Sequence, residues 1–262
     1  MENQDKMSKT ESRRQKIKQL IISNKVVSLT EFCEILHVSE STIRNDLKYL
    51  DEAGVLTRTY GGAVLNENTR YNIGMNTRYT MNIEQKEEIA GYVVEHLLRN
   101  NSIIFLDSGT TMVSIAKKIL DSMLELTVIT SSFAIASILS RNANIDLYLT
   151  GGKLNHIKEA FIDQTAIDFV STICPDLYLF SCDGVDEVNG FTIGDPEEVA
   201  IKKTVALHAR KIICVIDSTK INQVKMKKIF NSNEIDTIIT DSNAEEAAVE
   251  KFRSIGVNMI KT

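Results

Sequence analysis

The chain has 262 residues, of which 43% are hydrophobic and 25% charged, and its formal net charge is −5 at pH 7. These proportions are ordinary for a globular protein with one large domain, or with a small and a larger one. No apolar run approaches the roughly 20 residues that span a bilayer, and the polar start of the chain lacks the apolar core of a signal peptide. We therefore exclude a membrane protein and expect a cytoplasmic one.

The cysteines and histidines predict neither a metal site nor a cofactor. The four cysteines, Cys33, Cys174, Cys182 and Cys214, contain no CxxC pair, and the histidines show no HxxxH or HxH spacing. Metal ligands would have to converge from distant segments. We expect buried thiols in a reducing compartment.

Residues 1–65 predict three short helices followed by a hairpin. Apolar residues at helical spacing indicate a helix over 13–23 and a second one, opened by Ser28 or Thr30 and closed by a turn at 37–38. Ser39 suits the start of a third helix, which Gly54 is expected to end. Residues 55–59 and 63–65 predict a hairpin, and the backbone freedom of 61–62 suits its corner.

Two short helices joined by a tight turn, the second with a polar outer face, match helix-turn-helix geometry, and the hairpin adds a wing. Residues 1–65 hold ten Lys/Arg against nine Asp/Glu, so local placement of cations rather than net charge would supply phosphate contacts. An ordinary helical subdomain is the alternative. The side chains that can bond phosphates and base edges are Ser39, Ser41, Thr42, Arg44, Asn45, Lys48 and Arg58.

After a predicted linker at 66–80, the pattern alternates between helix and strand. Buried strands of four to six apolar residues between helices indicate a mainly parallel sheet with helices on both faces. The strands are expected at 103–106, 126–130, 145–149, 177–180, 212–216 and 235–239, and the helices at 84–98, 111–120, 133–139, 196–208 and 245–252.

Polar loops follow five of the predicted strands. In open α/β sheets, ligands bind at the carboxyl ends of the strands, and helix N-termini there favour anions. Each loop alone is more often a capped turn, but five at one edge predict a site for a small polar or phosphorylated ligand. The candidate residues in these loops are Asp107, Ser108, Gly109, Thr110, Thr111, Thr130, Ser131, Gly151, Gly152, Asp183, Asp186 and Lys220.

The segment STIRNDLKYLDEAGVLTRTYGGA at 41–63 resembles the signature of DeoR-family bacterial transcription regulators, which pair an N-terminal winged helix with a C-terminal sugar-phosphate sensor. His37, Asn45 and Tyr60 depart from the family pattern, where Gly, Arg and His are usual. LDSGTT, LTGG, SCDGVD and VIDSTK resemble the sensor domain, which is itself similar to ribose-5-phosphate isomerase. The resemblance spans residues 13–241.

The resemblance implies that residues 108–111 hold a phosphate and that Asp107, Asp183, Asp186 and Lys220 line the sugar end. We expect a winged helix-turn-helix domain at 1–65 and an α/β effector domain at 81–262. The predicted function is that of a DNA-binding regulator, a repressor of a carbohydrate operon that a phosphorylated sugar releases. Paired half-sites favour a homo-oligomer, a dimer or a tetramer.

The sequence leaves two other functions as alternatives. Asp183, Asp186 and Glu187 resemble the DGxDE run of the isomerase, which would make the C-terminal domain an enzyme fused to a DNA-binding head. However, the lysine and glycine-rich segment that follows this run in the isomerase has no counterpart here, so we expect no enzyme. An architectural DNA-binding protein would need a broadly basic surface, whereas residues 66–262 carry 26 acidic and 20 basic side chains.

Overall fold

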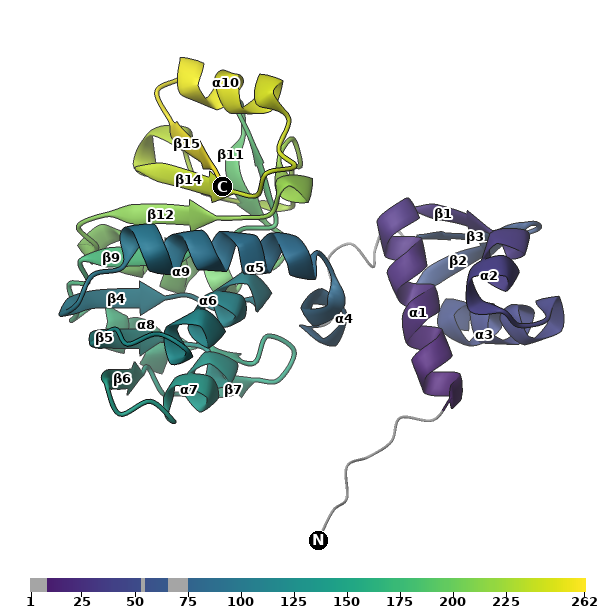
Figure 1. Ribbon diagram of the computed structural model, residues 1–262, viewed down its shortest axis with the longest axis horizontal. Coiled ribbons are helices and arrows are strands. Elements are labelled where there is room, and N and C mark those ends of the chain that lie inside the picture. The colour runs from purple at the N-terminus through teal and green to yellow at the C-terminus, as the bar shows by residue number, and fades with distance from the viewer. Residues whose placement is uncertain (1–8, 53–54, 66–74) are drawn as a thin grey trace, which may run out of the picture. The chain divides into compact units, whose positions relative to one another are not determined.

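The computed structural model describes residues 9–52, 55–65 and 75–262 (Figure 1). The chain divides into two compact units, Met1–Met81 and Asn82–Thr262. Gly54 and the first nine residues of the predicted linker, 66–74, lie outside the described residues. The last six residues of that linker form a helix, α4 (Met75–Thr80), which the sequence analysis did not predict because six residues are too few for a periodic signal.

Three helices build most of the first unit: α1 (Lys9–Asn24), α2 (Leu29–Leu36) and α3 (Glu40–Glu52). Ser28, one of the two predicted openers, caps α2 in a reciprocal arrangement with Glu31. The Ser39 hydroxyl accepts a 3.4 Å hydrogen bond from the backbone N–H of Thr42 at the start of α3. The apolar faces of the helices meet in one core that includes Ile17, Phe32, Ile43, Leu50 and Leu56.

The predicted hairpin, β2 (Leu56–Thr59) and β3 (Gly62–Leu65), is joined by an unpredicted strand, β1 (Val26–Ser28). The three strands form an antiparallel sheet in the order β1-β3-β2. A segment of three residues is too short for its alternation to be recognised, so β1 was not predicted.

The prediction that the hairpin corner needs the backbone freedom of its two glycines was wrong. Neither Gly61 nor Gly62 has a positive φ, so the corner does not need their conformational freedom. Gly62 is required because it faces Ser28 across the sheet, and a Cβ there would lie 2.2 Å from the carbonyl oxygen of Val27. Close approach between β1 and β3 selects glycine at 62, whereas a Cβ at 61 would meet no atom within 4 Å.

His37 occupies a left-handed conformation at the C-terminus of α2, with φ 54° and ψ 44°. Glycine adopts this conformation without the steric cost that a Cβ imposes. We expect His37→Gly to raise the free energy of unfolding by about 0.5–1 kcal/mol, measured by thermal denaturation. Glu34→Gly, inside the same helix, is the control and should lower stability by about 1 kcal/mol. Equal losses in both variants would contradict the argument.

A seven-stranded parallel sheet organises the second unit, with the strand order β15-β14-β12-β9-β4-β5-β6. Its strands are β4 (Ser102–Leu106), β5 (Leu126–Thr130), β6 (Ile145–Leu149), β9 (Leu177–Phe180), β12 (Ile212–Val215), β14 (Thr237–Thr240) and β15 (Asn258–Lys261). All but β15 were predicted, within two residues at each end.

Helices cover both faces of this sheet, as predicted. In Figure 1, α5 (Ile83–Tyr92), α6 (Thr110–Leu120) and α7 (Phe133–Leu139) lie in front, and α8 (Gln164–Val170) and α9 (Glu198–His208) lie behind. The helix α10 (Glu246–Ser254) packs near β15. The helix predicted over 84–98 is α-helical only to Tyr92 and continues as a π-helical turn, Val93–Leu97. No described helix has the length and apolarity needed to cross a membrane.

Between β6 and β14, the sequence predicted β9, α9 and β12, but not the other short elements. They are β7 (Leu154–Asn155), β8 (Ala160–Phe161), α8, β10 (Gly184–Asp186), β11 (Gly190–Ile193), β13 (Lys227–Phe230) and the 3₁₀ turns Ser218–Lys220 and Ser232–Glu234. Strands β10, β11 and β13 form a separate antiparallel sheet.

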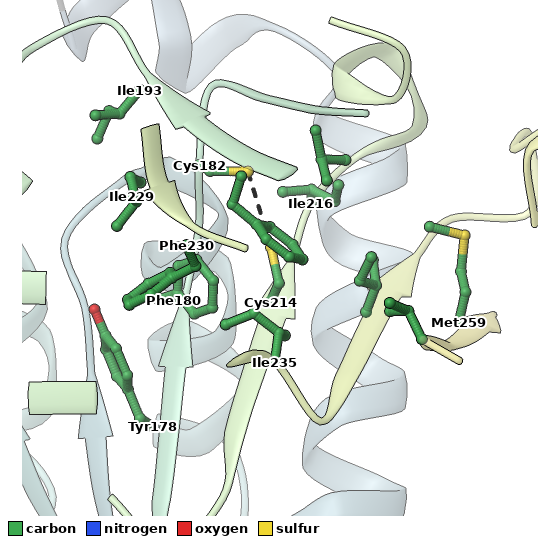
Figure 2. Close-up of a cluster of buried hydrophobic side chains, with 14 of the residues drawn as sticks. Tyr178, Phe180, Cys182, Ile193, Cys214, Ile216, Ile229, Phe230, Ile235 and Met259 are labelled. Carbon is green, nitrogen blue, oxygen red and sulfur yellow. Dashed lines mark hydrogen bonds between the residues drawn. The ribbon is translucent and has the colours of Figure 1, made fainter. Parts of the chain in front are cut away.

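The small sheet packs on the large one through an aromatic core (Figure 2). The Phe180 ring contacts Tyr178, Phe191 and Phe230, with ring centroids 5.2–5.9 Å apart. Cys182 and Cys214 are both buried in this cluster as free thiols, and their sulfur atoms are 3.9 Å apart. The core therefore fixes the carboxyl ends of β9 and β12, from which two of the five polar loops begin.

Candidate DNA-binding face and effector site

The polar face of α3 is exposed, as the sequence predicted. Ser41, Arg44, Asn45 and Lys48 are exposed, and Thr42 is half-buried. Arg44 lies 3.4 Å from Glu40 and Lys48 lies 3.9 Å from Glu52, both within the helix. Exposed pairs of this kind contribute at most about 1 kcal/mol, so DNA phosphates can replace the carboxylates.

Asp46 is a residue that the sequence analysis missed on this helix. Its side chain is buried and accepts hydrogen bonds from the Nε atoms of Arg13, at 2.6 Å, and Arg14, at 2.8 Å. The Arg14 guanidinium also lies 3.7 Å from the ring centroid of Tyr49. Asp46 therefore fixes α3 against α1. Its place on the inner side of α3, beside Ile43 and Leu47, was the available signal.

In the second unit, the parallel strands bring all five predicted polar loops to one edge of the large sheet. The loops follow β4, β5, β6, β9 and β12, which are neighbours in the order β12-β9-β4-β5-β6. We call this edge the carboxyl edge. Figure 1 shows the strands of the sheet side by side between the two helical layers.

The loop after β4 leads directly into the N-terminus of α6. Gly109 has φ 120° and ψ 162°, a conformation that is essentially restricted to glycine. No side chain among the described residues caps this helix. A Cβ on Gly109 would meet no atom within 4 Å, so the backbone faces open space. The N–H groups of a first helical turn have no partner within the helix, and together with the helix dipole they make this end of α6 suited to an anion.

Asp107, at the end of β4, is buried and paired with Lys202 of α9. The Lys202 Nζ atom also donates to the Ser181 carbonyl oxygen at 3.2 Å and lies 3.7 Å from Glu198. Burial alone would lower the pKa of Lys202, but Asp107 and Glu198 outweigh it and raise the pKa, so the ammonium stays charged. Burial raises the pKa of Asp107 against the opposing charge of Lys202.

Lys202 was not among the predicted site residues. The pair Glu198 and Lys202, four positions apart and next to the apolar Ile201, was the only sequence signal for it. The ion pairs continue to the turn between β7 and β8, where Lys158 lies 2.6 Å from Glu198 and 3.5 Å from Asp195.

The loops after β5 and β6 lie side by side, because Thr130 pairs with Leu149 across the sheet. Among the described residues, the buried hydroxyls of Ser131 and Thr150 have no hydrogen-bond partner. Gly151 and Gly152 both have positive φ values, and a Cβ on Gly152 would lie 2.2 Å from an Asp163 carboxylate oxygen.

The loops after β9 and β12 are joined by a hydrogen bond from Lys220 Nζ to Ser181 Oγ at 3.0 Å. Asp183 accepts the backbone N–H of Gly194 at 3.0 Å. Asp217, in the loop after β12, accepts a 3.0 Å hydrogen bond from the Asn82 side-chain amide. Lys220 and Lys202 thus reach the same serine from two different elements.

Asp186 is placed differently from the other candidates. It ends β10, and its carboxylate accepts hydrogen bonds from the backbone and the side-chain amide of Asn189 in the β10–β11 turn. This turn occupies one of the three carboxylates that the isomerase resemblance offers for proton transfer. In the described part of the chain, no three His, Cys, Asp or Glu side chains group as metal ligands.

Comparison with known proteins identifies both units. Residues 13–69 match the DeoR-like helix-turn-helix domain, and residues 81–242 match the DeoR C terminal sensor domain. These two matches define a DNA-binding regulator with a sensor domain. The chain belongs to the DeoR family of transcriptional regulators.

Relatives match along nearly the whole chain. The HTH-type transcriptional regulator GolR of Listeria innocua is 34% identical, covering 94% of this chain and 96% of the relative. The lactose phosphotransferase system repressor of Staphylococcus epidermidis is 31% identical over 91% and 94%. The transcriptional repressor GlcR of Bacillus subtilis is 29% identical over 90% of each. These relatives are named as regulators, not as enzymes.

Among solved structures, ribose 5-phosphate isomerase A of Methanocaldococcus jannaschii is 17% identical, with a TM-score of 0.40 and coverage of 53% of this chain and 55% of that one. A similarity of this degree carries no argument about activity.

Proposed function

We propose that this chain is a cytoplasmic repressor of a carbohydrate-utilisation operon, and that a phosphorylated sugar bound at the carboxyl edge releases it from its operator. The DNA-binding domain would occupy 1–65, the linker 66–80 and the effector domain 81–262. A single winged helix covers a short site, so we also propose assembly into a dimer or tetramer that presents paired DNA-binding domains.

The observation that carries the effector assignment is the uncapped N-terminus of α6 behind Gly109. An anion there would accept hydrogen bonds from backbone N–H groups and from the hydroxyls of Ser108, Thr110 and Thr111. Asp107, Asp183 and Lys220 would meet the sugar from neighbouring strands. The remaining contacts at this edge would come from Thr130, Ser131, Gly151 and Gly152. A hydrogen bond from the buried, unpaired Ser131 hydroxyl to a ligand oxygen would stabilise the complex.

The first test is a thermal-shift screen of the purified protein against pentose and hexose monophosphates, with the unphosphorylated sugars as controls. An effector at 100 times its Kd should add about 2.7 kcal/mol of stability. If no sugar monophosphate shifts the melting temperature more than its unphosphorylated counterpart, the effector assignment is wrong.

Gly109→Val should abolish the response to that effector while operator binding in its absence persists. The substituent enters the open space at the anion site, and valine cannot adopt φ 120° without strain. Gly256→Val is the matched control, because Gly256 also has a positive φ and an open Cβ position but lies beyond α10, away from the carboxyl edge. Operator release is measured by fluorescence anisotropy. Release of Gly109→Val at the wild-type effector concentration would contradict the proposal.

On the DNA side, Arg44 is the cation nearest the start of α3, where side chains reach base edges. We expect Arg44→Ala to weaken binding to a selected operator by about 1–3 kcal/mol and to relax sequence preference. Lys48→Ala, one helical turn further on, should weaken all sequences alike and reduce the salt dependence. Titrations with a duplex that the wild-type protein enriches from a random library measure both. Unchanged preference in Arg44→Ala would overturn its assignment to the bases.

A further inference from the structure

Tyr60, one of the departures from the family pattern, lies in the turn between β2 and β3 and is fully exposed, at 102% of the reference surface. It is the most exposed large hydrophobic side chain among the described residues, ahead of Met123 at 86%. The ring makes no contribution to the core of its own domain. Packing within the domain therefore does not select a tyrosine at this position.

Contacts with β1 and with the start of α2 fix the turn that carries Tyr60. The Leu29 backbone N–H donates a 2.7 Å hydrogen bond to the Gly61 carbonyl oxygen, and Gly62 packs directly against the backbone of β1. The β2–β3 ladder pairs continuously from Leu56 with Leu65 to Thr59 with Gly62. A rigid support lowers the entropy lost when an exposed side chain binds a partner. Figure 1 shows this hairpin in the same compact unit as α3.

The chemistry of the hairpin points to a polyanion. Residues 55–65 contain one cation, Arg58, and no carboxylate. A phenol combines a hydroxyl donor for phosphate oxygens with a flat apolar ring that can lie on a deoxyribose. Arg58 and Tyr60 are both exposed, so the charge and the donor are presented within three residues.

We propose that Tyr60 binds the DNA backbone beside the groove that α3 enters, with its hydroxyl donating to a phosphate oxygen and its ring packed against a sugar. This inference rests on the proposed DNA-binding function and adds a contact residue to it. The contact is to the backbone, so it strengthens binding to every sequence. Because tyrosine is neutral, it releases no counterion.

The experiment titrates the full chain and its variants with two duplexes, one enriched by the wild-type protein from a random library and one with the same bases scrambled. Tyr60→Ala should weaken binding to both duplexes about tenfold, and Tyr60→Phe, which loses only the hydroxyl, by about two- to tenfold. The salt dependence should stay at the wild-type slope, whereas Arg58→Ala should reduce it by about 0.9. Hydroxyl-radical footprints should lose protection only at the flanks of the site.

Tyr148→Ala, a half-exposed tyrosine on β6 in the other unit, is the matched control and should leave both affinities unchanged. The melting temperature of Tyr60→Ala should equal that of the wild type, because the side chain packs on nothing. Affinity within twofold of the wild type in Tyr60→Ala, while Arg44→Ala loses its preference, would overturn this inference alone. A loss confined to the enriched duplex would also overturn it, since the contact would then be to bases. Equal wild-type affinity for both duplexes would overturn the proposed function itself.

Discussion

Lys202→Met is expected to lower the free energy of unfolding of the effector domain by about 3–5 kcal/mol, because it leaves the Asp107 carboxylate buried without a counter-charge. Both residues are 2% exposed, so water cannot replace the lost ammonium. The Ser181 carbonyl oxygen loses a donor as well. Methionine fills a similar volume, so the effect is electrostatic and does not come from a cavity.

The stability of Lys202→Met should depend on pH, because the Asp107 carboxyl is buried. Without Lys202, the pKa of Asp107 in the folded protein rises further above its value in the unfolded chain. Such a group contributes stability below its unfolded pKa and loses it as the pH rises through the folded pKa. The deficit of Lys202→Met should therefore shrink as the pH is lowered toward the ordinary range of an aspartate. Urea unfolding at neutral and acidic pH measures this.

Lys203→Met is the matched control, because Lys203 is the next residue of α9 and is exposed. It should change stability by less than about 0.5 kcal/mol. Adding Asp107→Asn to Lys202→Met should recover part of the loss, since the pair is then removed together. If the free energy of unfolding of Lys202→Met lies within about 1 kcal/mol of the wild-type value, Lys202 does not stabilise the buried Asp107 carboxylate.

Gly62→Ala is expected to destabilise the winged-helix unit by about 3 kcal/mol and to abolish operator binding. The new Cβ would lie 2.2 Å from the Val27 carbonyl oxygen and 2.8 Å from the Ser28 Cα. Both are backbone atoms of a paired strand, so they cannot move aside without breaking the β1–β3 ladder. Displacement of the hairpin also displaces Arg58 and Tyr60.

The neighbouring glycine supplies the control. Gly61→Ala meets no atom within 4 Å and requires no positive φ, so it should leave stability and operator affinity near wild type. Thermal unfolding followed by circular dichroism, together with operator titration, separates the two variants. Comparable losses at both positions would show that the turn conformation, and not the approach of β1, requires glycine.

Much of the architecture followed from local patterns. Apolar residues at helical spacing predicted α1, α2 and α3, and apolar runs between helices predicted six of the seven strands of the parallel sheet. That alternation also implied that the polar loops share one edge, because parallel strands end on the same side. Ser39 and Ser28 marked helix starts through their side-chain hydrogen bonds.

Tertiary contacts decided the rest. Residue type does not distinguish Lys202 from Lys203, or Gly62 from Gly61, and the only local difference between the two lysines is the glutamate four positions before Lys202. Lys202 is buried because α9 presents it to Asp107 at the end of β4, 95 positions away. Gly62 is required because β1, three residues long, approaches it from elsewhere in the chain. The sequence by itself determined the periodic elements and the family signature. Only the tertiary structure decided which of two adjacent residues of the same type meets a distant partner, because that choice depends on contacts that no local period encodes.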